Sequence, residues 1–429
     1  MPHRAKRLEP EILCSMSLPS YFKFDPTTRH LSLDARNPAF YSNPNIGYTA
    51  MHAASPTFWW EEQNHWYFTG YDAVNALLRD RRFGRQITHV MSREELGWPQ
   101  PQPHLADFDR AESRSLLSIE PPEHTRLRTL VNRAFVSRNI ERLRPEITAL
   151  CHRLIDGFEK DGETELLARF AEIIPVTVIA SMIGVPPDMC RQLLDWSHDY
   201  VRMYMFSKTD EDEHRANLAA REFAAYIVQL AAERRADPQD DLLTLMLSPT
   251  RDGQYLTEDE LVSTAIVLLN AGHEATVHQI GNAVNIILKS GMNPQALFGD
   301  ARATELTVEE CFRISAPVHI FKRWALEDLE FDGISFRKGD EVGLILAGAN
   351  LDPRKFSDPL VFKPDRDQGT SLSFGAGIHF CIGAPLARLE MQIALPILFE
   401  RLPNMRIAAE PVVKDVYHFH GLDRLDLAW

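Results

Sequence analysis

Apolar residues recur with helical spacing through most of residues 122–236, which predicts a run of helices there. A polar break at 237–241 ends that run. The apolar pattern resumes after Thr257, and Thr257 with Glu260 has the spacing of a capping box. We therefore expect one helix from about 257 to 288, about 45–50 Å long at 1.5 Å per residue.

Shorter patterns predict a smaller β region. Aromatic-rich residues 58–60 and 65–69 predict a hairpin, and a short helix is expected at 71–79. Residues 86–120 lose periodicity and gain prolines, which predicts a long functional loop. Short strand-like runs alternate with glycines over 327–346.

The pattern predicts fewer elements in the first 40 residues and after residue 350. Residues 1–40 have a mixed pattern that assigns no element, and 350–367 is rich in proline and aspartate without a period. Residues 386–402 are helical in pattern, with Pro396 as a kink or a boundary.

Composition limits the class of protein. Of 429 residues, 45% are hydrophobic and 25% are charged, as in an ordinary globular protein. Sixty acidic and 46 basic residues give a net charge of −14, which argues against nucleic acid as a bulk electrostatic partner. No apolar run has the length of a signal peptide core or a bilayer span, so we expect no membrane anchor.

The cysteines are scattered and odd in number, which does not resemble a disulfide framework. A reducing cytoplasm is therefore the expected location. The five are Cys14, Cys151, Cys190, Cys311 and Cys381.

One cysteine, Cys381, lies in a glycine-rich segment just before a predicted helix. Glycines let a backbone turn tightly and approach a flat cofactor, and a helix N-terminus favours a thiolate. No second cysteine is near enough in sequence for a zinc or iron–sulfur cluster, so the lone thiolate suits axial ligation of haem iron. The alternative is a buried free cysteine in a turn, which the spacing of the segment argues against.

That spacing, Phe-x-x-Gly-x-His-x-Cys-x-Gly, runs from Phe374 to Gly383 and resembles the haem-binding signature of the cytochrome P450 family. The resemblance implies a mainly α fold with a smaller β-sheet region, and a long central helix over haem b held by the cysteine loop. It implies one domain over residues 1–429, of the soluble bacterial type. Phe374, Gly375 and Gly383 are then expected beside the haem, with Cys381 as the iron ligand.

The middle of the long predicted helix reads Ala-Gly-His-Glu-Ala-Thr at 271–276. Gly272 costs about 1 kcal/mol relative to alanine, and either a local opening of the helix or helix packing would explain it. The segment resembles the oxygen-binding groove of the family, in which an acid is followed by threonine. Glu274 matches the acid, but Ala275 follows it, and Thr276 lies about 100° further around the helix. Our hypothesis is that water, or a hydroxyl on the substrate, completes the proton relay.

A zinc-protease helix is the rival interpretation of His273, Glu274 and His278. That site needs histidines at i and i+4. The spacing here is i and i+5, about 140° apart on a helix, so we do not expect these two histidines to share a metal.

Glu310 and Arg313 match the Glu-x-x-Arg of the family, and i, i+3 residues on a helix can pair. By spacing alone this would be an ordinary surface pair. The resemblance implies a buried pair that meets residues 350–366.

The two carboxylates of haem need cationic partners, and the resemblance implies four. His124 and Arg128 lie at i and i+4, His379 lies two residues before the cysteine, and Arg323 follows the ion-pair helix. Lys322 is a weaker alternative to Arg323.

The resemblance places an apolar substrate pocket on five segments, with His319 as a polar exception able to bond a polar group of the substrate. The segments are 86–118, 200–206, 268–275, 318–320 and 419–422.

No nicotinamide or flavin fingerprint is present, so electrons are expected from another protein, which the resemblance implies is a small acidic ferredoxin. A local basic patch is one interpretation of four arginines, and solvated helix faces are the other. They are Arg126, Arg133, Arg138 and Arg388.

The function implied is that of a haem-thiolate monooxygenase, which inserts one oxygen atom from O2 into a small, mostly apolar organic substrate. Two alternatives stay open. One is a haem-thiolate enzyme that uses peroxide or performs a non-oxygenase step, and the other is a haem-binding sensor without catalysis.

Overall fold

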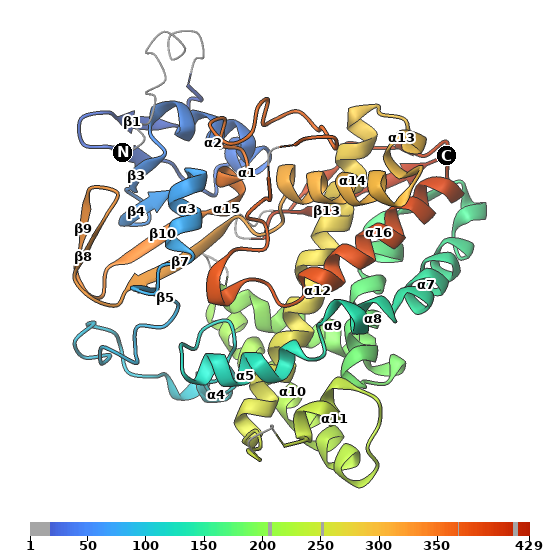
Figure 1. The fold of residues 1–429 in the computed structure, drawn as a ribbon, viewed down its shortest axis with the longest axis horizontal. Helices are drawn as coiled ribbons and strands as arrows, with labels where there is room; N and C mark the ends of the chain where they lie inside the picture. The colour runs from blue at the N-terminus through green and yellow to red at the C-terminus, as the bar shows by residue number, and fades with distance from the viewer. Residues whose placement is uncertain (1–17, 205–207, 250–252, 368, 415–418) are drawn as a thin grey trace.

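A computed structural model describes residues 18–204, 208–249, 253–367, 369–414 and 419–429. Cys14, residues 1–17 of the unassigned N-terminal segment and residues 205–206 of the expected pocket lie outside the described residues. In Figure 1 the strands of the large sheet lie on the left together with the short helices α1, α2, α3 and α15, most of the longer helices lie to the right and below, and α12 runs down the middle.

The central helix α12 (Glu258–Ser290) runs through the molecule as one unbroken element of 33 residues, about 50 Å long (Figure 1). Its start is the predicted capping box: the Thr257 hydroxyl accepts from the Glu260 amide at 3.3 Å, and the Glu260 carboxylate accepts from the Thr257 amide at 2.9 Å. It ends at Gly291, whose φ of 66° lies in the left-handed region.

The other helices confirm a mainly α protein. They are α1 (Pro38–Tyr41), α2 (Pro44–Ala54), α3 (Tyr71–Leu77), α4 (Ala106–Glu112), α5 (Glu123–Asn132), α6 (Ser137–Glu141), α7 (Arg144–Asp156), α8 (Ile173–Ile183), α9 (Cys190–Val201), α10 (Asp210–Ala236), α11 (Leu242–Leu247), α13 (Pro294–Phe298), α14 (Ala301–Ile314), α15 (Leu346–Ala349) and α16 (Ala384–Arg401).

A seven-stranded mixed sheet joins strands from residues 23–84 to strands from residues 320–345, in the order β1-β2-β3-β4-β10-β7-β5. The predicted hairpin is β3 with β4, and β4 runs parallel to β10 from the last third of the sequence. The strands are β1 (Lys23–Asp25), β2 (His30–Ser32), β3 (Thr57–Trp60), β4 (His65–Phe68), β5 (Phe83–Gly84), β7 (Ile320–Ala325) and β10 (Glu341–Ile345).

Small sheets complete the β region. The β8–β9 hairpin turns through Asp332-Gly333, both at positive φ, as a two-residue turn requires. The remaining strands are β6 (Glu163–Glu165), β8 (Leu329–Phe331), β9 (Ile334–Phe336), β11 (Arg406–Ile407), β12 (Val412–Val413), β13 (Leu422–Arg424) and β14 (Asp426–Ala428).

Three expectations need correction. The loop at 86–120 contains α4, because Phe108 and Ala111 give it a buried face. The helical run from 122 to 236 is interrupted by β6, which pairs with β14 from the C-terminus. Pro396 does not mark a helix boundary, because α16 continues on both sides of it.

The interior consists of one large apolar cluster among the helices and two smaller ones against the sheet. Within the described residues, no helix combines the length and the apolar character that crossing a bilayer demands.

Candidate active site

The loop before α16 is shaped by glycines. Gly375 and Gly377 have φ of 67° and 73°, a region that L side chains rarely adopt. A Cβ on Gly377 would also overlap the carbonyl oxygen of Leu78. The Cys381 amide donates to the Phe374 carbonyl at 3.0 Å, and Gly383 caps α16, where an added Cβ would lie 3.9 Å from the Cys381 sulfur. The loop therefore holds Cys381 just before the N-terminus of α16.

The ionisation of Cys381 differs from the expectation. The residue is exposed, yet nearby protein atoms desolvate the thiol and raise its pKa. The Gly383 and Ala384 amides and the charges of Arg128 and Arg388 oppose this shift but do not cancel it. The helix N-terminus favours the thiolate as expected, through the Gly383 and Ala384 amides, but desolvation outweighs it and the net pKa is raised. Deprotonation is then coupled to metal binding.

The ring of Phe374, at the start of the loop, packs against side chains of α14 and α16. Its ring lies 4.7 Å from that of Phe312, and the Arg388 guanidinium lies 4.5 Å above its centre. The contact ties the start of the loop to α14 and α16.

Five cationic side chains gather near the cysteine loop, and we call them the cationic cluster. His124 and His379 lie with ring centres 4.4 Å apart, and Arg128 donates to the carbonyl of Phe380, the residue before the cysteine. Arg323 is 2% exposed. The members are Arg85, His124, Arg128, Arg323 and His379.

The pKa shifts in the cluster show that burial, and then the neighbouring cationic groups, disfavour positive charge on its members. Burial, then the charge of Arg85, lowers the pKa of Arg323 to about 9. Burial, then His379 and Arg128, lowers the pKa of His124 to about 4. Glu120 offers partial compensation, at 3.6 Å from His379.

The cluster fits an anionic ligand. In the described part of the chain, Nε2 of His124 and Nε2 of His379 are buried without a hydrogen-bond partner. Unpaired buried polar groups and crowded cations are costly unless an anion joins them. The two carboxylates of haem supply that charge, so this donor set and the adjacent thiol suit the cofactor. Lys322 instead pairs with Glu341 at 3.0 Å, which favours Arg323 as the clamp.

On α12 the expected oxygen-side segment forms regular helix. A Cβ on Gly272 would lie 2.7 Å from Ile179 of α8, so this glycine permits helix packing, and the expected local opening is not present. Ala271 is exposed and Ala275, at i+4, is half-buried, so they share the accessible face of the helix. Thr276 is buried and offers no hydroxyl on that face.

Glu274 is 8% exposed and lies beside two histidines. Burial alone would raise its pKa, but its close neighbour His273, whose Nε2 lies 3.5 Å from Oε1 of Glu274, and then His198 lower it to about 2. The carboxylate is therefore ionised at neutral pH.

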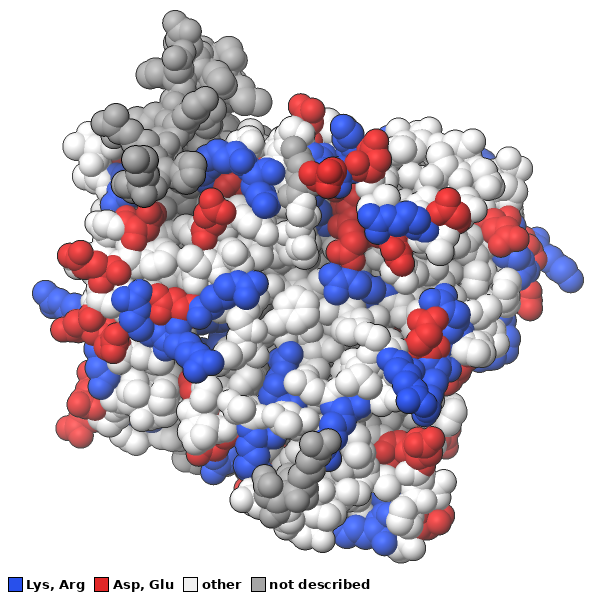
Figure 2. Space-filling view, viewed as in Figure 1, with Lys and Arg blue, Asp and Glu red and all other residues white. Residues whose placement is uncertain are grey.

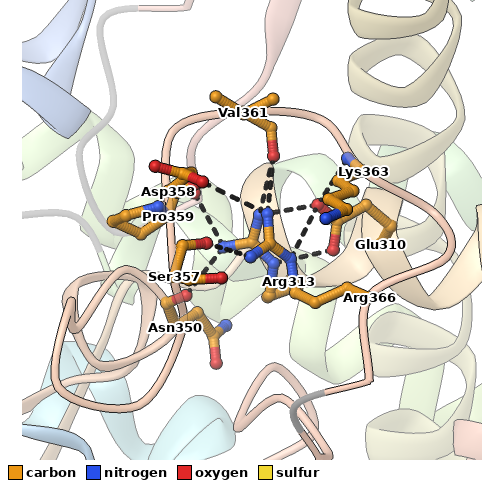
Figure 3. A network of polar contacts seen from close by, with 9 residues as sticks. All are labelled: Glu310, Arg313, Asn350, Ser357, Asp358, Pro359, Val361, Lys363 and Arg366. Atoms are coloured by element: carbon orange, nitrogen blue, oxygen red, sulfur yellow. Dashed lines mark hydrogen bonds and ion pairs between the residues drawn. The ribbon is translucent and has the colours of Figure 1, made fainter.

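Glu310 and Arg313 form a buried pair at the centre of a polar network (Figure 3). Arg313 also donates to the carbonyls of Asn350 and Pro359 at 3.0 and 2.8 Å, and Glu310 accepts from the Lys363 amide at 2.9 Å. The pair thus fixes the segment 350–366 that precedes the cysteine loop.

The segments expected at the substrate pocket are partly brought together. Glu112 of α4 accepts from the hydroxyls of Tyr200 and Tyr204 at 2.7 and 2.9 Å, which joins the 86–118 segment to the end of α9. His319 is 3% exposed and bonds the Tyr48 hydroxyl through Nδ1 at 2.6 Å. That nitrogen serves the fold rather than a substrate.

The four arginines proposed as a basic patch separate into two groups. Arg126 pairs with Glu260, and Arg388 pairs with Glu309 at 2.5 Å. Among the described residues, Arg133 and Arg138 have no ion pair. Figure 2 shows basic side chains over the α5 region set in mostly uncharged surface.

Sequence analysis missed Arg85 and Glu120. β5 pairs Gly84 with Trp324 of β7, and this pairing carries Arg85 to Arg323. The Glu120 carboxylate then accepts from the Arg85 amide. Only the register of two distant strands creates this proximity, so no local pattern could have revealed it.

Comparison with known proteins agrees with this site. The Cytochrome P450 family model matches residues 298–404. The polyketide biosynthesis cytochrome P450 PksS of Bacillus subtilis (strain 168) is 35% identical over 347 residues, covering 81% of this chain and 84% of PksS. The biotin biosynthesis cytochrome P450 of the same strain is 33% identical, covering 91% and 97%.

The fold agrees as well. The crystal structure of P450BioI with an acyl carrier protein ligated to hexadec-9Z-enoic acid has a TM-score of 0.85 and 32% identity, covering 92% of this chain and all of that one. Relatives are named monooxygenases and hydroxylases, which sets aside the sensor alternative. The chain belongs to the cytochrome P450 family, as an oxygen-incorporating oxidoreductase whose cofactor is haem b.

Proposed function

We propose that this protein inserts one atom of O2 into a small, mostly apolar organic molecule in the cytoplasm, with electrons from a separate ferredoxin-type protein. The observation that carries the proposal is the glycine loop that presents Cys381 beside the cationic cluster. A thiol and an anion-binding set together match the two things that haem b offers, an iron and two carboxylates.

Each part of the site has a proposed role. The Cys381 sulfur holds the iron, and the positive φ at Gly375 and Gly377 allows the backbone to approach the flat cofactor closely. The cationic cluster holds the carboxylates. Bound haem supplies the oxygen chemistry, while the protein orients the substrate and controls protons.

Glu274 is the proposed proton carrier on the oxygen side. Its carboxylate is ionised at neutral pH, so it can accept a hydrogen bond from a water molecule and take part in the relay through that water. Ala275 provides no hydroxyl beside it, and the hydroxyl of Thr276 is buried. Water, or a hydroxyl of the substrate, completes the path.

The redox partner is proposed to dock near α5 and α6. Arg133 and Arg138 provide positive charge there with no ion pair to another described residue, and Val136 between them is 49% exposed. Phe380, next to the cysteine, is 38% exposed. A small acidic protein with an apolar contact would complement this surface.

Carbon monoxide tests the central assignment. The purified, haem-loaded protein is reduced under carbon monoxide and its absorption spectrum is recorded. A thiolate-ligated spectrum is expected, and Cys381→His is expected to replace it. An imidazole-type spectrum in the wild type would overturn the proposal.

A second candidate is peroxide-driven turnover, which Ala275 favours because reaction with peroxide has less need of a proton relay for oxygen cleavage. Product formed with peroxide, and none with any ferredoxin and reductase, would select it.

A further inference from the structure

Three side chains of metal-binding type meet where α9 contacts α12. His198 lies on α9, and His273 and Glu274 are neighbours on α12. Oε1 of Glu274 lies 3.5 Å from Nε2 of His273 and 3.6 Å from Nε2 of His198. Ligand atoms of all three lie within 4.8 Å of one another.

Two of these atoms are buried without a hydrogen-bond partner. His273 is 2% exposed, and its Nε2 and Oε1 of Glu274 have no hydrogen bond within the described residues. Two buried polar atoms pointing at one spot without a hydrogen bond are costly unless something bridges them.

The ring of His273 is already set for a metal. Its Nδ1 lies 2.8 Å from the carbonyl oxygen of Leu269, which can only accept, so Nδ1 carries the proton. In the neutral ring this leaves the lone pair on Nε2, toward Glu274. Metal-ligating histidines commonly donate from their other nitrogen in this way.

We propose that His198, His273 and Glu274 form a binding site for a divalent cation of the zinc type. Two imidazoles and a carboxylate are ligands that Zn²⁺ accepts, at about 2.0–2.2 Å each. Tetrahedral geometry at those lengths separates ligand atoms by about 3.3 Å, close to the 3.5 and 3.6 Å observed. The three ligand atoms lie within 4.8 Å of one another, so closing the site requires the side chains to move together.

The site has a way in and an open position. The side chain of His198 is 50% exposed, so an ion can enter from solvent. Three protein ligands leave a fourth position for water. His273 and Glu274 are adjacent on α12, and His198 comes from α9. This arrangement differs from the zinc-protease helix, in which two histidines of one helix bind the metal.

Bound Zn²⁺ occupies the carboxylate of Glu274 and links α9 to α12. This consequence rests on the proposed function, in which Glu274 carries protons. We expect Zn²⁺ to slow oxygen-dependent product formation because the coordinated carboxylate can no longer accept a proton.

Zinc binding is tested first, without turnover. The haem-loaded protein is dialysed against Zn²⁺ alone and the bound metal is counted by atomic absorption. We expect one tight site in the wild type, weakened at least tenfold in His198→Ala and in Glu274→Gln.

The matched control is His104→Ala. Nε2 of His104 lies 2.8 Å from Glu213, and its side chain is 38% exposed, so it is a similar surface pair without a third ligand. It should keep the tight site. Equal zinc binding in wild type and His198→Ala, or equal loss in His104→Ala, would overturn the proposal.

Inhibition is the second measurement. Zn²⁺ at the concentration that fills the tight site should slow turnover in the wild type and leave the rate of His198→Ala unaffected. If the proposed function fails and no product forms, the dialysis result still decides whether the metal site exists.

Discussion

The carboxylate of Glu310 accepts two parallel hydrogen bonds from the guanidinium of Arg313, each 2.7 Å long, where both side chains are under 5% exposed. The charges are fully engaged, because the same arginine also binds backbone carbonyls of the segment before the cysteine loop. Helix α14 and that segment are therefore held together by one buried group of polar contacts.

Glu310→Ala is expected to give protein without haem. Removing one partner leaves the Arg313 charge buried and uncompensated, which costs about 3–5 kcal/mol of unfolding free energy. Haem content per chain after purification measures the effect.

Glu309→Ala is the matched control, because Glu309 pairs with Arg388 one position away but with side chains 38% and 26% exposed. Loss of this pair should cost about 1 kcal/mol or less. Normal haem content in Glu310→Ala would refute the structural role of the buried pair.

Gly377→Ala is expected to disrupt the cysteine loop. A left-handed φ costs a residue with a side chain about 1–2 kcal/mol, and here the added Cβ would also overlap the Leu78 carbonyl oxygen. Gly369→Ala has a similar φ, of 89°, but its nearest neighbour is the flexible end of Lys355 at 3.2 Å. Haem loading should fall in the first variant and stay near wild type in the second. Equal loading in both would remove the steric argument.

The sequence predicted the elements whose signals are local. The capping box at Thr257 and Glu260 begins α12 as expected, because both partners lie within one turn. The aromatic segments form the β3–β4 hairpin for the same reason. Glu310 and Arg313 pair because i, i+3 residues share a helix face.

Contacts between segments that are distant in the sequence could not be predicted. Arg85 reaches Arg323 only through the β5–β7 pairing, and His198 reaches Glu274 only because α9 packs on α12. The sequence indicated the helix N-terminus that lowers the pKa of Cys381, but not the surrounding atoms whose desolvation of the thiol raises it.

Acid should destabilise the protein through His278. The residue is 4% exposed, and burial, then the charge of Lys414, lowers its pKa to about 4. The unfolded chain, with a pKa near 6.5, binds more protons below that value, so stability falls as pH drops from about 6.5 toward 4.

Between pH 7 and pH 5 this one group should remove about 2 kcal/mol of unfolding free energy. Urea unfolding at both pH values, followed by tryptophan fluorescence, measures it. His278→Asn should reduce the loss, whereas His89→Asn, at an exposed position, should behave as the wild type. If His278→Asn loses as much unfolding free energy between pH 7 and pH 5 as the wild type, other groups cause the loss.

Electron delivery should depend on salt and on two arginines. Arg133→Glu and Arg138→Glu are expected to slow reduction by a small acidic ferredoxin several-fold at low ionic strength, because attraction at the docking surface is lost. The wild-type rate should fall as salt is added. Stopped-flow reduction under carbon monoxide records both effects. A rate that salt does not change would eliminate this surface as a charged docking site.

Ala275→Thr should change how much consumed oxygen appears in product. A threonine here adds a hydroxyl to the accessible face of α12, beside Glu274, where the native chain depends on water or on the substrate. For substrates without a hydroxyl we expect coupling to rise, and for substrates that supply one we expect little gain.

Thr276→Val is the matched control, since the side chain it alters is buried and should not affect coupling. Oxygen consumption and product are measured together over several substrates. If coupling in Ala275→Thr equals that of the wild type for all of them, the relay does not depend on a hydroxyl at this position, and protons reach the oxygen side by water that Glu274 alone controls.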